Sequence, residues 1–119
     1  MIATEGLTHL HLRVSDLAVS LSFYQSVFGM QEMFRDGGMV FLNTPGSKDL
    51  ITLNPQGDGP VGVEGGIGHF GFRLKPEVEL DDAIRAVEDN GGKLIRRGEH
   101  APGVTYAYVA DPDGYVIEL

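Results

Sequence analysis

Polar and apolar residues alternate in two stretches of the chain that have matching sequences. Residues 7–14 read L-T-H-L-H-L-R-V, and residues 67–74 read I-G-H-F-G-F-R-L. His9 matches His69 at an offset of 60 residues (69 − 9). Alternation with a period of two is typical of a β-strand that has one apolar and one polar face. The repeat therefore predicts an internal duplication, with one histidine at the equivalent place on the polar face of each copy.

Each of the two stretches is followed by the same series of predicted elements. Apolar residues at helical spacing predict helices over residues 17–28 and 79–90, and a glycine follows each of them. Further strands are predicted at residues 31–34, 39–43 and 50–53 in the first half and at residues 93–97, 104–110 and 115–119 in the second. This order predicts two βαβββ modules and an α+β fold.

The glycine-rich and proline-rich residues 55–66 predict a connector between repeats of about 5–54 and 67–119. Neither half is large enough to stand alone. The chain of 119 residues is therefore expected to form a single domain, 1–119, whose halves share a core within one subunit or across a dimer. The connector is not a phosphate-binding loop, because no Lys-Ser or Lys-Thr pair follows its glycines and the next element is a strand.

The composition argues against several classes of function. The net charge of −8 disfavours a nucleic-acid partner, which would need clustered lysine and arginine. The absence of cysteine removes disulfides, thiolate ligands and a cysteine nucleophile, so any metal must be bound by nitrogen and oxygen. No stretch has the pattern of a signal peptide or of a membrane span, and a soluble, cytoplasmic protein is expected.

The last predicted strand adds a carboxylate to the two histidines. In Y-V-I-E-L, residues 115–119, the alternation places Glu118 on the polar face, and the first half has Thr52 at the corresponding place. Two histidines and one carboxylate form the ligand set typical of non-haem iron(II), and manganese(II) is also compatible. Such a metal keeps open positions for two neighbouring oxygens of a substrate. Because Glu118 is the penultimate residue, either packing holds Leu119 in place or the natural chain extends further.

Three longer patterns carry a resemblance to a known family. They read G-L-T-H-L-H-L-R-V-S-D-L-A-V-S-L-S-F-Y-Q-S-V-F-G, G-H-F-G-F-R-L and D-P-D-G-Y-V-I-E-L. Together they resemble the vicinal oxygen chelate superfamily, which includes glyoxalase I, extradiol ring-cleaving dioxygenases, fosfomycin-resistance proteins and bleomycin-binding proteins. The resemblance implies a curved, partly open mixed sheet around a metal cleft, with helices outside, and a homodimer. It also implies that His9, His69 and Glu118 bind a divalent metal, with iron(II) or manganese(II) favoured and nickel(II) or zinc(II) as further candidates.

The segment from Gly98 to Glu118 resembles the extradiol dioxygenase signature in particular. That match implies that His100, expected in a loop, is an active-site histidine beside the metal ligands, and that Tyr108 donates a hydrogen bond to a bound diol. Extradiol enzymes use a further histidine as base shortly before the second ligand histidine. This chain has none between His11 and His69, so His11 is the alternative. The leading prediction is an extradiol-dioxygenase-like oxidoreductase that acts on a catechol-type small molecule.

Other branches of the superfamily define the alternatives. Glyoxalase I has a fourth ligand, a carboxylate, at the position of Thr52, which weakens a glyoxalase-like lyase or isomerase reaction. A fosfomycin-type resistance enzyme would use the same three ligands together with a cationic pocket for a phosphonate. The only nearby candidates for that pocket are Arg13, Arg73 and residues 93–97, so this alternative ranks lower. A metal-free drug-binding protein of the bleomycin type would suit the net negative charge, but those relatives lack the three ligands. An apolar cavity is expected, with Met39, Phe41, Leu53 and Tyr106 as its lining.

Overall fold

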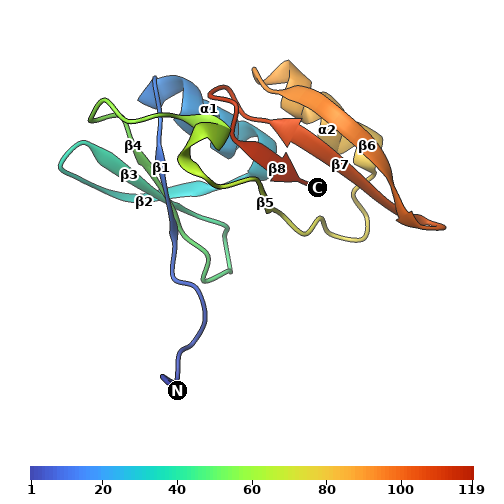
Figure 1. Ribbon diagram of the computed structural model, residues 1–119, viewed down its shortest axis with the longest axis horizontal. Helices are drawn as coiled ribbons and strands as arrows, with labels where there is room; N and C mark the ends of the chain where they lie inside the picture. The colour runs from blue at the N-terminus through green and yellow to red at the C-terminus, as the bar shows by residue number, and fades with distance from the viewer.

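The computed structural model describes residues 1–119 as two four-stranded mixed sheets with two α-helices (Figure 1). Sheet A contains β1 (Leu10–Arg13), β2 (Gln31–Asp36), β3 (Met39–Asn43) and β4 (Ile51–Asn54), and sheet B contains β5 (Phe70–Gly71), β6 (Lys93–Ala101), β7 (Val104–Ala110) and β8 (Val116–Glu118). The strand orders are β1-β4-β3-β2 and β5-β8-β7-β6, and in each sheet only the first of these pairs is parallel. The predicted α+β class with two βαβββ modules is confirmed, and the sheets do not close.

The helices begin and end within one residue of the predicted positions. α1 (Leu17–Phe28) follows Asp16, whose side chain accepts a hydrogen bond from a backbone N–H of the first turn and caps the helix. It ends at Gly29, where a φ of 64° favours a residue without a side chain. α2 (Leu80–Asp89) occupies the equivalent place in the second module. Neither helix combines the length and the apolarity that crossing a membrane requires.

The strand register shows that the two modules have the same internal plan. One row of paired residues crosses sheet A as His11, Thr52, Phe41 and Phe34, and the equivalent row crosses sheet B as Gly71, Glu118, Tyr108 and Arg96. Each row ends at a β-bulge in the outermost strand pair, before Phe34 in sheet A and before Arg96 in sheet B. The register therefore places Thr52 at the position that Glu118 holds in the second module.

The hydrophobic core lies between the sheets and the helices, and both helices cover the same side of the molecule (Figure 1). It contains 15 buried residues from both modules, among them Leu12 and Leu53 of sheet A and Val109 and Ile117 of sheet B. Side chains alternate between the two faces of a strand, so the rows defined above stand on the other face of the sheets, away from the helices. That face is the one that carries the polar chemistry.

Polar contacts join the two modules within one chain. The Tyr24 hydroxyl of α1 donates a hydrogen bond to Oδ2 of Asp111, which precedes β8, at 2.9 Å. The Tyr115 hydroxyl donates to the backbone carbonyl of Arg13, at the end of β1, at 2.7 Å. Because these partners are far apart in sequence and the Tyr24 pair is buried, the contacts help to fix how the modules sit against each other.

Three details differ from the sequence prediction. The strand predicted at residues 67–74 pairs only at Phe70–Gly71, because it is an edge strand and its single neighbour, β8, is only three residues long. Leu53 is fully buried in the core and does not line a cavity, so that part of the prediction is wrong. His100, expected in a loop, lies in β6, which continues to Ala101 because its second half pairs with the start of β7.

Candidate functional site

The carboxylate of Glu118 is the centre of a cluster on the open face of sheet B. Its Oε1 lies 3.0 Å from Nε2 of His100, and its Oε2 lies 3.2 Å from Nε2 of His69. Glu118 ends β8, His69 comes directly before β5, and His100 lies near the end of β6. The structure therefore brings together two of the three predicted metal ligands and the histidine that the signature match placed beside them.

Two tyrosines of β7 hold the imidazoles of this cluster. The ring of Tyr106 stacks on the ring of His100, with centroids 4.2 Å apart, and the ring of Tyr108 meets that of His69 edge-on at 5.0 Å. Tyr106 also lies directly over Gly98, where an added Cβ would come within 2.8 Å of the tyrosine hydroxyl. A residue without a side chain is needed at this point so that Tyr106 can take up its position over β6.

The surrounding groups favour the ionised form of Glu118. The pKa of this carboxyl is lowered from its ordinary value, chiefly by the hydrogen bond from His100, with smaller contributions from the charges of His69 and His100 and from the Tyr108 hydroxyl. Glu118 is therefore an acceptor carboxylate at neutral pH. A carboxylate in this state can bind a cation or receive a proton.

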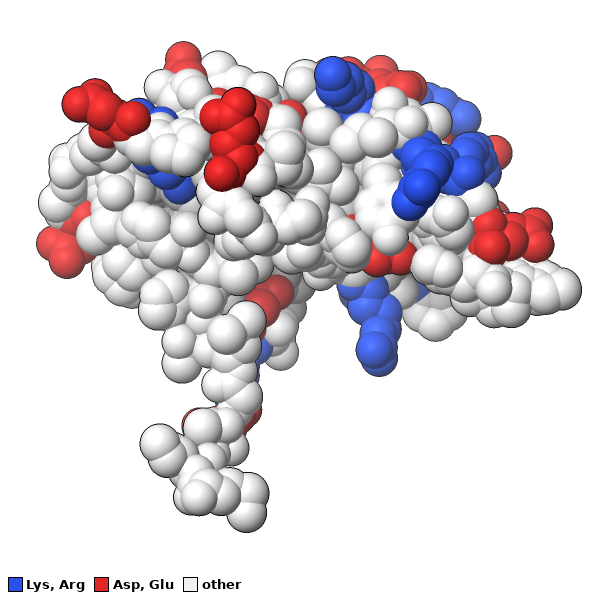
Figure 2. Space-filling view, in the orientation of Figure 1, with Lys and Arg blue, Asp and Glu red and all other residues white.

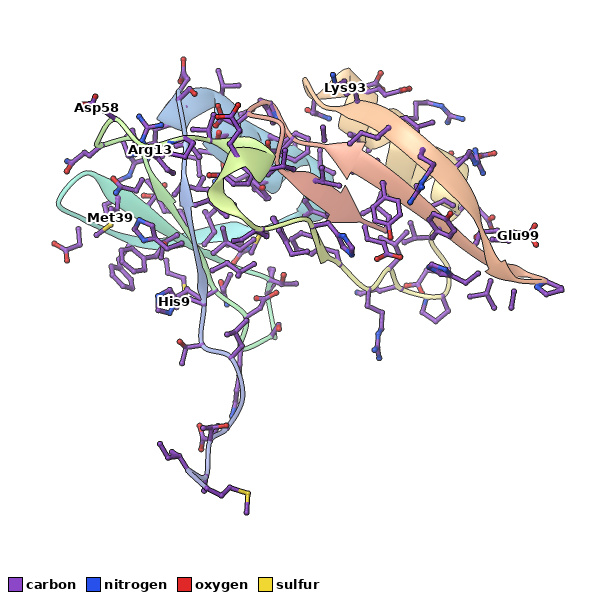
Figure 3. The ribbon with its side chains drawn as sticks, in the orientation of Figure 1. His9, Arg13, Met39, Asp58, Lys93 and Glu99 are labelled. Atoms are coloured by element: carbon purple, nitrogen blue, oxygen red, sulfur yellow. The ribbon has the colours of Figure 1, made fainter.

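The third predicted ligand, His9, lies apart from this cluster. It precedes β1 of sheet A, and in Figure 3 its ring lies on the side of β1 away from β8. Nδ1 of His9 shares a hydrogen bond of 2.8 Å with the Thr8 hydroxyl, which leaves Nε2 without a partner. His11 is exposed two residues further along, on the same face of the strand.

Within one chain, no three histidine, aspartate or glutamate side chains converge as a metal centre. The pair formed by His69 and Glu118 nevertheless fits a metal. Ligand atoms at about 2.1 Å from a cation and at a right angle to each other are separated by roughly 3 Å, which is close to the distance between Nε2 of His69 and Oε2 of Glu118. This pair offers one nitrogen and one oxygen ligand, and His9 does not join it within the chain.

Thr52, at the position equivalent to Glu118, does not offer a fourth ligand. Its side chain is buried, with 1% of its surface exposed, and its hydroxyl donates to the backbone carbonyl of Leu10 at 3.4 Å. A neutral hydroxyl in this arrangement cannot replace a carboxylate ligand. The two modules therefore have the same backbone plan but different chemistry at this position.

A groove of about 690 Å³ separates the two sheets near β1 and β5. Most of its walls are apolar, and they come from both modules and from both helices. The lining residues include Leu10, Phe28, Phe70, Phe72, Leu74 and Leu119. His9 borders this groove, whereas Glu118, His100 and Tyr108 do not. The groove is therefore distinct from the polar cluster on the open face of sheet B.

The position of Leu119 explains how a penultimate residue can be held in place. Leu119 donates a backbone hydrogen bond to the carbonyl of Ala107 at 2.8 Å and accepts one from the N–H of the same residue at 3.2 Å. Its side chain packs against the core. Glu118 is thus fixed on both sides by strand pairing with β7.

Arg96 was only one of several candidate cations in the sequence, and its place on this face was not predicted. The alternation of residues 93–97 gives no reason to place it beside Tyr108, because a regular antiparallel pair would bring Ile95 there after the pair of Leu94 with Val109. The β-bulge shifts the register by one residue and turns Arg96 onto the open face. No local sequence signal marks this bulge.

The fold and the cluster around Glu118 define a class of protein. A sequence model of the family described as the Glyoxalase/Bleomycin resistance protein/Dioxygenase superfamily matches residues 6–119. The chain belongs to this superfamily, whose members share the vicinal oxygen chelate fold, and the resemblance predicted from the sequence is confirmed.

Individual relatives are similar along nearly the whole chain. A lactoylglutathione lyase of Neisseria meningitidis serogroup A is 36% identical over 127 residues, covering 95% of this chain and 88% of that protein. A probable lactoylglutathione lyase of Synechocystis sp. is 32% identical, covering 95% of this chain and 92% of that protein. The crystal structure of the fosfomycin resistance protein FosX from Listeria monocytogenes matches with a TM-score of 0.79 and 22% identity, covering 98% of this chain and 91% of that chain. This match shows a shared fold.

Proposed function

We propose that this protein is a metal-dependent enzyme of the lyase type, whose small-molecule substrate binds through two neighbouring oxygen atoms. The observation that carries the proposal is the pair of ligand atoms, Nε2 of His69 and Oε2 of Glu118, held 3.2 Å apart on an open face. The relatives named lactoylglutathione lyase, at 31% to 36% identity over 93% to 95% of this chain, favour the lyase type over other reactions of the superfamily.

The third ligand is proposed to be His9 of a second copy of the chain. His9 does not reach the pair of His69 and Glu118 within its own chain, and its Nε2 atom is free. β1 and β5 are both edge strands beside the apolar groove, and such edges are places where a second chain can pack. A homodimer with twofold symmetry would then contain two equivalent sites, each built from both subunits.

Two imidazoles and one carboxylate suit iron(II) and manganese(II), and nickel(II) and zinc(II) accept the same ligand atoms. When bound, such a metal supplies Lewis acidity that polarises two neighbouring oxygens of the substrate. The chain itself supplies the groups that hold and move protons. His100, bonded through Nε2 to Glu118, forms with it a couple that can take up a proton and return it. Tyr108 is proposed to donate a hydrogen bond to a substrate oxygen, and His11 of the partner subunit is proposed as the base.

Thr52 separates this protein from a lactoylglutathione lyase with four protein ligands. Its buried hydroxyl is engaged with Leu10, so the proposed site has three protein ligands and leaves more positions open for the substrate. We therefore expect a different substrate from that of the named relatives, although the type of reaction is similar.

Ring cleavage of a catechol is the second candidate. The specific observation in its favour is that His100 and Tyr108, which the extradiol signature pairs with the ligand glutamate, both lie beside Glu118. The absence of a base histidine between His11 and His69 weighs against it. The two reactions differ in their need for oxygen, because ring cleavage consumes O2 and a lyase reaction does not.

The test is to purify the protein under nitrogen, measure its metal content, and assay it with and without O2. We expect bound divalent metal that is lost in Glu118→Gln and His69→Ala, and turnover of a vicinal hydroxy-carbonyl or dicarbonyl compound without O2. Turnover of catechols with equal consumption of O2 would favour the second candidate. Protein that contains no metal and binds a ligand equally well in Glu118→Gln would overturn both and favour a drug-binding protein.

A further inference from the structure

Arg96 is a cation without a carboxylate partner in a strongly acidic chain. The protein has 17 acidic and nine basic residues. Three arginines form ion pairs with carboxylates, Arg35 with Glu32, Arg85 with Asp82, and the adjacent Arg97 with Asp81. Arg96 forms no ion pair, and its guanidinium instead lies over the ring of Tyr108 at 4.9 Å from the centroid. The guanidinium is exposed and keeps its hydrogen-bond donors free for another molecule.

The position of Arg96 relates it directly to the candidate site. Arg96 pairs across the strands with Tyr108, and Tyr108 pairs with Glu118, so the three side chains follow one another on one face of sheet B. Neighbouring strands are about 5 Å apart, which places Arg96 and Glu118 roughly 10 Å from each other at the backbone. This separation is the length of a small organic molecule that reaches from one residue to the other.

The β-bulge in β6 brings the side chain of Arg96 to the open face of sheet B. With a regular register, Ile95 would face Tyr108, but the bulge leaves Ile95 half exposed and turns Arg96 to the open face. Sheet A has a bulge at the equivalent place, and it stacks Phe34 on Phe41, with ring centroids 4.3 Å apart. The same backbone feature therefore presents an apolar ring in one module and a cation in the other.

The surface view agrees with this difference. Figure 2 shows basic side chains gathered over β6 on the sheet B half of the molecule, while acidic ones dominate the visible part of the sheet A half. An exposed guanidinium that forms no ion pair favours an anionic group at this point of the surface, in a protein whose net charge is −8.

We propose that Arg96 binds a carboxylate of the substrate and that the substrate is a small organic acid, with the carboxylate several atoms away from the two neighbouring oxygens. This inference rests on the proposed function, because it places those oxygens beside Glu118 and His69. The guanidinium binds the carboxylate with two parallel hydrogen bonds, and Tyr108 beneath it keeps the guanidinium plane in position.

The test compares two catechol probes that differ in one ring substituent, which is charged in only one of them. 3,4-Dihydroxybenzoate and 4-methylcatechol chelate a divalent metal through the same pair of oxygens, but only the first has a carboxylate on the far side of its ring. Calorimetry on the manganese-loaded dimer is expected to show that the acid binds roughly tenfold tighter or more. The preference should be lost in Arg96→Gln, with the affinity for 4-methylcatechol unchanged. It should be kept in Arg97→Gln, the adjacent arginine, whose partner is Asp81.

The outcomes separate this inference from the function on which it rests. Equal affinities for the two probes in the wild type, or a preference that survives Arg96→Gln, would overturn the role of Arg96 and leave the metal site intact. Failure of both probes to bind more tightly with manganese than without it would overturn the proposed function and the inference together. If Arg96→Gln has the same thermal unfolding temperature as the wild type, its effect on binding is local.

Discussion

Nε2 of His100 lies 3.0 Å from Oε1 of Glu118, which links the longest strand of sheet B to the end of β8. On the other side, His69 approaches Oε2 of the same carboxylate at 3.2 Å. Each carboxylate oxygen therefore has its own imidazole. The contact with His100 is suited to orient the carboxylate, and His69 is suited to share a metal with it.

Loss of the His100 imidazole is expected to raise the pKa of Glu118 toward its ordinary value of 4.5. The hydrogen bond from His100 is the largest cause that lowers this pKa, and a donor to the ionised form stabilises that form. In His100→Ala the carboxyl should therefore take up its proton at a higher pH than in the wild type. Carbon-13 NMR titration of the metal-free protein measures this change. An identical titration in His100→Ala would contradict the role given to this contact.

Gly98→Ala is expected to disturb the site without unfolding the protein. The new Cβ would come within 2.8 Å of the Tyr106 hydroxyl, and the tyrosine ring can swing away because it is only partly buried. His100 then loses its stacking partner, so the pKa of Glu118 should rise as it does in His100→Ala. The free energy of unfolding should change by less than about 1 kcal/mol.

Gly92→Ala is the matched control for that variant. Its Cβ would meet the carbonyl oxygen of Ala110 at 2.5 Å and the side chains of Val87 and Phe23 at 2.6 and 2.9 Å, all of them in or beside the core. We expect a loss of about 1–3 kcal/mol in urea unfolding, because well-packed atoms must move. If Gly98→Ala destabilised the protein more than Gly92→Ala, the account of Tyr106 as a movable support for His100 would be wrong.

The buried carboxyl of Asp111 makes stability depend on pH in a defined direction. Burial raises its pKa above the ordinary 3.8, although the Tyr24 hydroxyl and two backbone N–H groups donate to it. A raised pKa in the folded state means that the native protein binds the proton more tightly than the unfolded chain. The contribution of Asp111 to stability is therefore present at a pH below the unfolded value and is lost as the pH rises through the folded value.

The variant Asp111→Asn has no ionisable side chain at this position and should lack this contribution to the pH dependence of stability. We expect its free energy of unfolding, relative to that of the wild type, to increase as the pH rises from about 3 to about 7. The altered hydrogen bond to Tyr24 adds a difference that does not depend on pH. Urea unfolding over this range measures both. A relative stability that falls with pH would show that the sign of the pKa shift is wrong.

The repeated pattern in the sequence was sufficient to predict the fold. The strand alternation around His9 and His69 and the apolar spacing of the two helices gave the α+β class and the order of elements, because these features depend on local periodicity. The same alternation put Glu118 on the polar face of its strand, where the structure places it beside His69. Local patterns predicted both the element order and the face on which each of these side chains stands.

The remaining features depend on register, which the sequence does not show. Arg96 reaches the open face only through a β-bulge, and His100 belongs to a strand because β6 pairs with β7 beyond its predicted end. Leu53 was expected to line a cavity. Its strand, β4, lies between β1 and β3 in sheet A, and the side chain of Leu53 points into the core. Whether His9 meets His69 and Glu118 depends on the packing of two copies, which no local pattern encodes.

Mixing of subunits tests the central claim, a metal site shared between two copies of the chain. His9→Ala and Glu118→Ala should each abolish metal binding when alone. After the two variants are unfolded together and refolded in equal amounts, half of the dimers carry one of each, and every such dimer has one site with all three ligands intact. Elemental analysis should then find about one metal ion for every four chains. A mixture that binds no more metal than the separate variants would contradict a site built from His9 of one subunit and from His69 and Glu118 of the other.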